Sequence, residues 1–194
     1  MTAIESTDQS PVVNIWGERV ALGPIRRDLL PLYQRWMNDW EVIRTLGQPI
    51  RPMTLESEES WFDSAARGGA RFQIYERDGL RPIGTTSLED VDQAHRTATF
   101  GILIGEKDCW GKGYGTETAR LMLDYGFNAL GLHNIMLQVY SNNERGYRAY
   151  LRAGYTEIGR RRQARRVGAQ VHDIILMDCL ASEFESPVIK KLLE

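Results

Sequence analysis

The sequence contains few of the residues that build disulfide frameworks and metal centres. Only two of its 194 residues are cysteines, Cys109 and Cys179, and only three are histidines, His95, His133 and His172. The two cysteines lie far apart in the chain, which matches neither a disulfide framework nor the ligand spacing of a zinc site. The histidines form no HExxH or CxxH arrangement. We therefore expect two reduced structural thiols and no metal chemistry.

Long apolar runs and an excess of one charge are also absent. No apolar run approaches the roughly 20 residues that span a bilayer, and the N-terminal stretch MTAIESTDQSP lacks the basic and apolar blocks of a signal peptide. Hydrophobic residues make up 42% and charged residues 26%, and the formal net charge is −2. This composition excludes a disordered chain and a generally basic nucleic-acid binder. We expect a cytoplasmic protein without a membrane or nucleic-acid partner.

The length suits a single domain with a sizeable core. Residues 1–14 are polar and predict a loose N-terminal lead-in, followed by a domain over residues 15–180 and a tail over residues 181–194. Within the domain, apolar residues alternate in the segments predicted as strands and recur at helical spacing in those predicted as helices. The resulting order, β αα βββ α β α ββ, is that of a mixed α/β chain without internal repeats.

The predicted helices have recognisable ends. Asp28 is expected to cap the first, over residues 28–40, and Thr54 the second, over residues 54–69. The third follows a glycine-rich loop and ends at Gly131, and the fourth ends at Gly154. On the third helix the spacing predicts one buried and one solvent-facing side. The buried set is Ala119, Met122, Leu123, Phe127 and Leu130, and the solvent-facing set is Glu117, Arg120, Asp124 and Asn128.

The loop before the third helix has glycine at every second position, Gly111, Gly113 and Gly115. A glycine-rich turn that opens a helix exposes backbone N–H groups and the positive end of the helix dipole, which suits phosphate oxygens. A tight turn without a ligand is the alternative. The letters do not fit a P-loop, since Lys112 is followed by Gly113, or a dinucleotide fingerprint, since neither reading frame supplies the third glycine.

A second motif one strand downstream favours the phosphate interpretation. The segments WGKGYGTE (Trp110 to Glu117) and NERGYRAYLRAGY (Asn143 to Tyr155) follow each other in the order and at the separation of the GCN5-related N-acetyltransferase (GNAT) superfamily. Together with the order of elements over about residues 17–180, they make the chain resemble that superfamily. Trp110 stands where the family consensus has Arg or Gln, which is more similar to the branch of ribosomal-protein-alanine and spermidine N-acetyltransferases.

The resemblance implies a mixed, mostly antiparallel sheet of about seven strands, flanked by about four helices, with a splayed strand pair where acetyl-CoA binds as cosubstrate. The backbone of one strand would pair with the pantetheine arm, loop amides would bind the pyrophosphate, Lys112 would add charge, and Asn143 would contact the arm. The implied cofactor-binding set is Ile102, Leu103, Ile104, Trp110, Gly111, Lys112, Gly113, Tyr114, Gly115, Thr116 and Asn143.

By the same resemblance, Tyr150 is the catalytic residue, acting as general acid. A phenol with a pKa of about 10 is protonated at neutral pH and can protonate a leaving thiolate. The alternative for Tyr150 is a core aromatic on a short helix.

The general base stays open at this point. Glu89, Asp90, Asp92 and His95 lie near the expected acceptor position, although a solvated turn is the commoner place for such carboxylates. Thr99 occupies a position where relatives often carry Glu. Deprotonation through a water chain is therefore a further alternative.

The acceptor also stays open, between a protein N-terminal amine and a small amine such as a polyamine, an antibiotic or an amino acid. Tyr33, Trp36 and Trp40 of the first helix would wall an acceptor cleft or pack in the core. Arginines of the last hairpin would bind an acidic acceptor or a cofactor phosphate, or face solvent. These are Arg160, Arg161, Arg162, Arg165 and Arg166.

The sequence therefore predicts an N-acetyltransferase that moves the acetyl group of acetyl-CoA to a primary amine by direct attack in a ternary complex. A non-catalytic acyl-CoA sensor is the alternative, and a nucleic-acid adaptor conflicts with the overall charge. The resemblance implies a homodimer. The apolar residues of the tail would dock on their own domain or on a neighbour.

Overall fold

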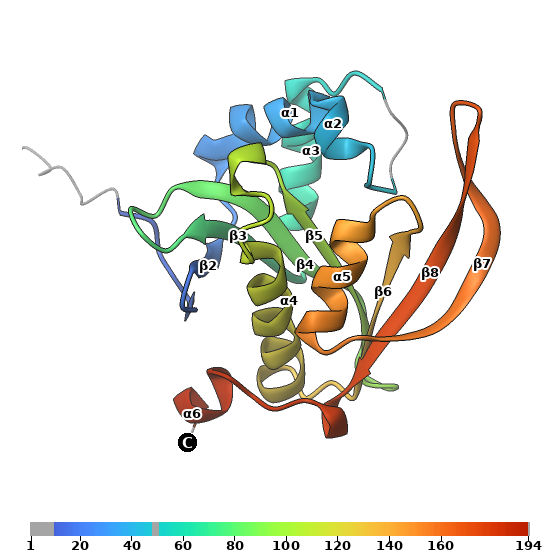
Figure 1. The fold of residues 1–194 in the computed structure, drawn as a ribbon. Helices are drawn as coiled ribbons and strands as arrows, with labels where there is room; N and C mark the ends of the chain where they lie inside the picture. Colours follow the sequence, from blue (N-terminus) through green and yellow to red (C-terminus); the bar gives the residue numbers. More distant parts are fainter. Residues whose placement is uncertain (1–9, 48–50, 194) are drawn as a thin grey trace, which may run out of the picture.

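The computed structural model describes residues 10–47 and 51–193 (Figure 1). Part of the predicted lead-in, residues 1–9, lies outside the described residues. The strands are β1 (Ile15–Trp16), β2 (Val20–Pro24), β3 (Ala70–Glu76), β4 (Pro82–Asp92), β5 (Thr97–Ile104), β6 (Asn134–Tyr140), β7 (Thr156–Val167) and β8 (Gln170–Leu180). The helices are α1 (Leu30–Asn38), α2 (Trp40–Ile43), α3 (Leu55–Ala65), α4 (Tyr114–Asp124), α5 (Glu144–Ala153) and α6 (Ile189–Leu193).

The described strands form one mixed sheet in the order β1-β2-β3-β4-β5-β6-β8-β7. Neighbouring strands are antiparallel except for β5 and β6, which are parallel. The predicted mixed, mostly antiparallel sheet is thus confirmed. The sequence pattern missed β1, because two residues are too short for an alternation to be recognised.

Strands β5 and β6 diverge soon after they meet. They pair only over residues 97–99 of β5 and 134–136 of β6, whereas β5 stays paired with β4 as far as Ile104 opposite Gly84. The backbone of the second half of β5 is therefore free of a strand partner on the β6 side. This is the predicted splayed pair.

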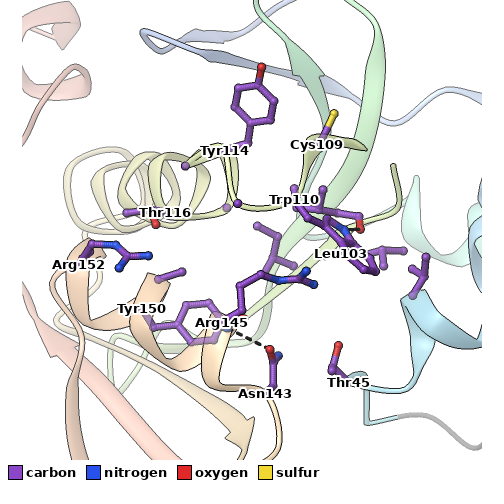
Figure 2. A pocket seen from close by; sticks show the side chains of 18 of the residues that line it. Thr45, Leu103, Cys109, Trp110, Tyr114, Thr116, Asn143, Arg145, Tyr150 and Arg152 are labelled. Carbon is purple, nitrogen blue, oxygen red and sulfur yellow. Dashed lines mark hydrogen bonds between the residues drawn. The ribbon is translucent and has the colours of Figure 1, made fainter. Parts of the chain in front are cut away.

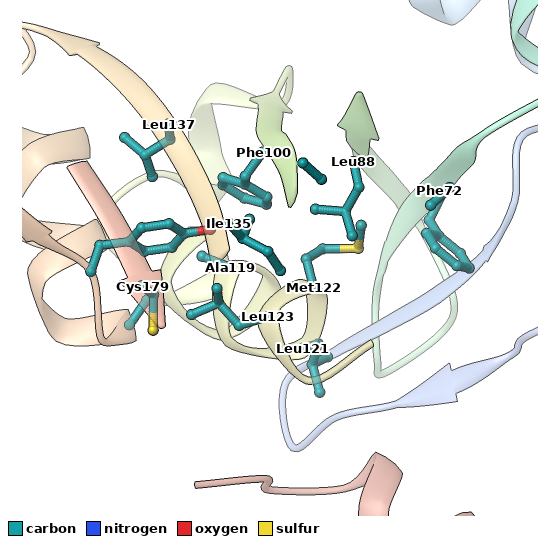
Figure 3. Close-up of a cluster of buried hydrophobic side chains, with 14 of the residues drawn as sticks. Phe72, Leu88, Phe100, Ala119, Leu121, Met122, Leu123, Ile135, Leu137 and Cys179 are labelled. Atoms are coloured by element: carbon teal, nitrogen blue, oxygen red, sulfur yellow. The ribbon is translucent and has the colours of Figure 1, made fainter. Parts of the chain in front are cut away.

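The core lies between the sheet and α4, and Figure 3 shows side chains of both meeting there. Met122 and Leu123 of α4 and Ile135 of β6 are fully buried. Such burial is the main favourable term in folding. The predicted buried stripe is confirmed at Ala119, Met122 and Leu123 of α4 and at Phe127 of the π-helical turn Tyr125–Ala129 that continues it, and Leu130 is partly buried.

Asp124 corrects the predicted solvent face of α4, because it is 0% exposed. Its carboxylate accepts hydrogen bonds from Ser186 Oγ at 2.6 Å and from the backbone N–H groups of Val188 and Ile189 at 2.9 and 2.8 Å. Hydrogen bonds of this kind offset the cost of burying a carboxylate. The tail thus docks on its own domain, which places α6 against the end of α4.

The first helix also differs from its prediction. Asp28 does not cap it; its carboxylate binds the guanidinium of Arg26, and α1 begins two residues later. Thr54 caps α3 as predicted, accepting a hydrogen bond from the Ser57 N–H at 3.2 Å. Both cysteines are free and buried, as expected of structural thiols. Within residues 10–47 and 51–193, no helix is long and apolar enough to cross a membrane.

Candidate functional site

A groove lies where β5 leaves β6, between the loop before α4 and the start of α5 (Figure 2). All of the predicted site residues line it except Lys112, which is exposed and whose carbonyl accepts a hydrogen bond from Arg19. The predicted residues that the fold brings together are Ile102, Leu103, Ile104, Trp110, Gly111, Gly113, Tyr114, Gly115, Thr116, Asn143 and Tyr150.

The glycine loop presents its backbone to the groove. Gly111 and Gly113 have φ values of +76° and +87°, a region that glycine adopts without the strain of a side chain. Gly113 is the N-cap of α4, and among the described residues no side chain accepts a hydrogen bond from the first N–H groups of that helix. Free N–H groups at a helix N-terminus attract an anion.

Two hydrogen bonds, one from Trp110 and one from Tyr114, hold this loop in place. Trp110 Nε1 donates a hydrogen bond to the Ile104 carbonyl at 2.9 Å, which ties the loop to the end of β5. The Tyr114 ring points away from Tyr150 in Figure 2, and its hydroxyl donates to Glu76 at 2.6 Å. That hydrogen bond raises the pKa of Tyr114 to about 12. The Tyr114 hydroxyl is therefore directed away from the groove, toward which the glycines of the loop present their backbone.

The opposite wall is α5. Asn143 is its N-cap, and the Oδ1 atom accepts a hydrogen bond from the Gly146 N–H at 3.0 Å. Arg145 reaches across the groove so that its Cζ lies 3.9 Å from the centroid of the Trp110 ring. Burial, together with the nearby Arg44, lowers the pKa of Arg145. A cation over an aromatic face at this distance links the two walls.

Tyr150 lies on the groove side of α5 and also contacts the core. Its ring centroid is 6.1 Å from those of Phe100 and Tyr155, in edge-to-face geometry. Within the described chain the Tyr150 hydroxyl has no hydrogen-bond partner, yet it is not among the polar atoms sealed from solvent, whereas the Tyr155 hydroxyl is sealed. Burial raises the pKa of Tyr150 to about 12. The phenol therefore keeps its proton at neutral pH.

A second cavity of about 460 Å³ lies on the other side of β5. It is walled by α1, α3 and the strands β4 and β5, and it shares Leu46, Ile102 and Leu103 with the groove. Tyr33 and Trp36 line it, but Trp40, the third aromatic of the predicted wall, is 67% exposed and lines neither space. The two spaces meet at the free backbone of β5.

The candidate bases do not form a catalytic cluster. Glu89 lines the second cavity, but it binds Arg71 at 2.8 Å and accepts a hydrogen bond from Ser87. Asp92 and His95 pair with each other at 2.8 Å on the exposed turn between β4 and β5, and neither they nor Asp90 line the groove or the cavity.

The arginine hairpin contributes no side chain to either space. Arg165 lies over the Tyr140 ring at 3.9 Å and donates to the Arg44 carbonyl at 3.1 Å. Arg160 binds Glu157, and Arg161, Arg162 and Arg166 are exposed. Four of the five arginines therefore match the solvent-facing alternative, whereas Arg165 is partly buried against Tyr140.

Sequence reasoning missed several residues that line the two spaces, Arg145 among them. Thr45 and Leu46, which follow α2, line the groove, but they belong to no recognisable sequence motif. Glu58 lines the second cavity and is buried in line with Phe62 and Ala65. That spacing, i, i+4 and i+7, is the buried stripe of a helix. The sequence signal that could have identified Glu58 was a carboxylate on the apolar stripe of a helix.

Comparison with known proteins agrees with this geometry. The family model described as an acetyltransferase (GNAT) domain matches residues 19–156. The chain belongs to the GNAT acetyltransferase family. This GNAT chain is 29% identical over 140 residues to the spermidine N(1)-acetyltransferase of Escherichia coli K12, covering 72% of this chain and 74% of the relative. It is 28% identical over 160 residues to human alpha/beta-tubulin-N-acetyltransferase 9, covering 73% and 74%.

Comparison of the fold with solved structures also finds an N-acetyltransferase. A crystal structure of spermidine N-acetyltransferase from Vibrio cholerae in complex with CoA and spermine matches with a TM-score of 0.78 and 23% identity, over 86% of this chain and 98% of that one. The chain is thus a GNAT enzyme that uses acetyl-CoA to acetylate an amine. The relatives give no support to the non-catalytic sensor.

Proposed function

We propose that the groove binds acetyl-CoA with its pyrophosphate on the amides of residues 111–116 and its pantetheine arm along Ile102, Leu103 and Ile104. The uncapped N-terminus of α4 supports the first contact, because its N–H groups lack side-chain acceptors. The strand-free edge of β5 supports the second, because a polar arm can pair with its backbone. Lys112 adds positive charge from outside the groove, and Asn143 mainly orders α5.

The proposed reaction is a direct transfer in which Tyr150 acts as general acid. Acetyl-CoA supplies an acetyl group already activated as a thioester. The neutral amine attacks the acetyl carbon, the C–N bond forms as the C–S bond breaks, and the nitrogen releases a proton to solvent. Tyr150 gives its proton to the leaving sulfur and takes another from solvent. The unpartnered hydroxyl of Tyr150 in the groove is the observation that carries this proposal.

The acceptor amine enters, in this proposal, through the second cavity, since that space meets the groove at Ile102 and Leu103. One relative is named for spermidine and another for tubulin, so a small amine and a protein amine both have a precedent. A cytoplasmic location and a homodimer stay predictions.

The test combines binding and turnover. Calorimetry with coenzyme A should show saturable binding, and a thiol-release assay with acetyl-CoA should show turnover on members of a panel of small amines and of peptides with free N-termini. Coenzyme A binding without turnover on any amine would contradict the proposed reaction. Absence of binding would contradict the proposed groove as well.

A further inference from the structure

Glu58 is a carboxylate that the fold buries without a partner. It is 5% exposed and belongs to the buried face of α3. Its side chain makes no hydrogen bond or ion pair with any residue that the structure describes, whereas the neighbouring Glu89 is paired with Arg71. Burying an unpaired carboxylate is costly unless a ligand provides its counter-charge.

The carboxylate faces the second cavity. Glu58 lines that space, and its oxygens are not among the polar atoms sealed from solvent. Burial also raises the pKa of Glu58, because the apolar surroundings disfavour its charged form. Arg51 lines the same cavity but is exposed, so solvent screens its charge. The cavity is therefore the place from which a cationic group of a ligand could reach the Glu58 carboxylate.

Aromatic rings form the wall beside it. The Tyr33 ring centroid lies 5.8 Å from those of both Trp36 and Trp61, and all three residues line the cavity. The Tyr33 hydroxyl donates to Gln73 and Trp36 Nε1 donates to Glu106, so these polar atoms are already used. Ring faces attract a cation and pack against a methylene chain.

These features suit a nitrogen other than the one that reacts. A carboxylate at low dielectric favours the charged ammonium form, whereas the attacking nitrogen must be neutral. We propose that Glu58 is a specificity residue that binds a second, cationic nitrogen of the acceptor, so that the preferred acceptor is a diamine or polyamine. This inference rests on the proposed function and names its acceptor class. The volume of about 460 Å³ is within the usual range for a small ligand.

The experiment compares two acceptors with the same four-carbon chain, butane-1,4-diamine and butylamine, which differ by the second amino group. Each is tested with the wild type, Glu58→Gln and Glu59→Gln. Glu59 is the matched control, because it follows Glu58 on α3 and is exposed. We expect the wild type to have a kcat/KM at least about tenfold higher for the diamine, as an ammonium–carboxylate contact provides. Glu58→Gln should remove this preference through KM, and Glu59→Gln should retain it.

A binding measurement keeps the test independent of turnover. Butane-1,4-diamine should raise the Tm of the wild type and of Glu59→Gln in the presence of coenzyme A, but not that of Glu58→Gln. Equal diamine preference, or an equal Tm shift, in Glu58→Gln and the wild type would overturn the inference. So would a better kcat/KM for a peptide with neutral side chains than for the diamine.

A different failure would reassign the residue. If Glu58→Gln lowered kcat equally on both amines and removed the acidic limb of the pH profile, Glu58 would be the proton acceptor and the inference would be wrong. Turnover of both amines with no preference would overturn the inference alone. If the wild type acetylated no amine at all, the proposed function would fail with it.

Discussion

The groove and the second cavity meet at β5 but are built in different ways. One wall of the groove is a continuous loop, residues 110–116, which offers main-chain N–H groups at the start of α4. The cavity is instead made by side chains of separate elements, with Tyr33 and Trp36 from α1, Glu58 and Trp61 from α3, and Glu89 from β4. In the proposed function, the first space would therefore recognise its ligand mainly with the backbone and the second with side chains.

This difference decides what a sequence can reveal. A site made of main-chain amides needs glycines at fixed spacing, and the chain has Gly111, Gly113 and Gly115 in one stretch. A site made of side chains needs only suitable residues that meet after folding, and these lie far apart in the chain. Substitutions in one space therefore test whether cofactor binding and acceptor binding are independent of each other.

The largest expected effect comes from Tyr150→Phe, at the wall nearest the chemistry. Removing the acid should lower kcat at least tenfold. General-acid catalysis usually contributes a factor of about a hundred or more. The ring and its contacts with Phe100 and Tyr155 remain, so the Kd for acetyl-CoA should be nearly unchanged. Thiol release and calorimetry measure the two quantities.

Tyr147→Phe is the control for this change. Tyr147 is on the same helix, but its hydroxyl binds Glu157 at 2.9 Å and it does not line the groove. Its kcat should stay close to that of the wild type. Unchanged turnover in Tyr150→Phe would leave Tyr150 as a core aromatic only.

A smaller effect is expected from Gly113→Ala, which acts on the groove alone. An alanine at φ +87° is strained by about 1–2 kcal/mol, and its Cβ would lie 3.1 Å from Arg19 Nη1. Relief of this backbone strain is expected to move the loop amides, so the Kd for acetyl-CoA should rise about tenfold. The KM for the amine should not change.

Gly131→Ala provides the same backbone strain elsewhere. Gly131 has φ +67°, its added Cβ would meet nothing within 4 Å, and it lies after the end of α4. Its stability should fall comparably, without any change in the Kd for acetyl-CoA. Equal weakening in both variants would mean that global stability, and not the loop geometry, controls binding.

The sequence predicted most of the fold because local signals agreed with tertiary structure. Alternating residues identified all strands except β1, and the Thr54 cap and Gly154 marked helix ends correctly. Asp124 was misplaced because the segment that binds its carboxylate, residues 186–189, comes 62 to 65 positions later in the chain. Asp28 failed as a cap because Arg26 competes for its carboxylate.

The groove was predicted better than the cavity for the same physical reason. Its glycines and Asn143 act through helix ends, which are local features with recognisable letters. Glu58 could be seen only as an exception on the buried stripe of α3, and nothing local indicates that Tyr33 and Trp61 meet beside it. Thr45 and Leu46 reach the groove through the packing of the first helices, which no short motif encodes.

The smallest expected effect is an absence of pH dependence on the groove side. Burial raises the pKa of Tyr150 to about 12, so the phenol stays protonated well above neutrality. With both substrates saturating, kcat should therefore stay flat from pH 8 to pH 10. A phenol of ordinary pKa, about 10, would be half ionised at pH 10 and would halve the rate. A twofold fall in the wild type that is missing in Tyr150→Phe would contradict the raised pKa. If kcat is flat, any change of kcat/KM in this pH range comes from the acceptor amine, which must lose its proton before it attacks.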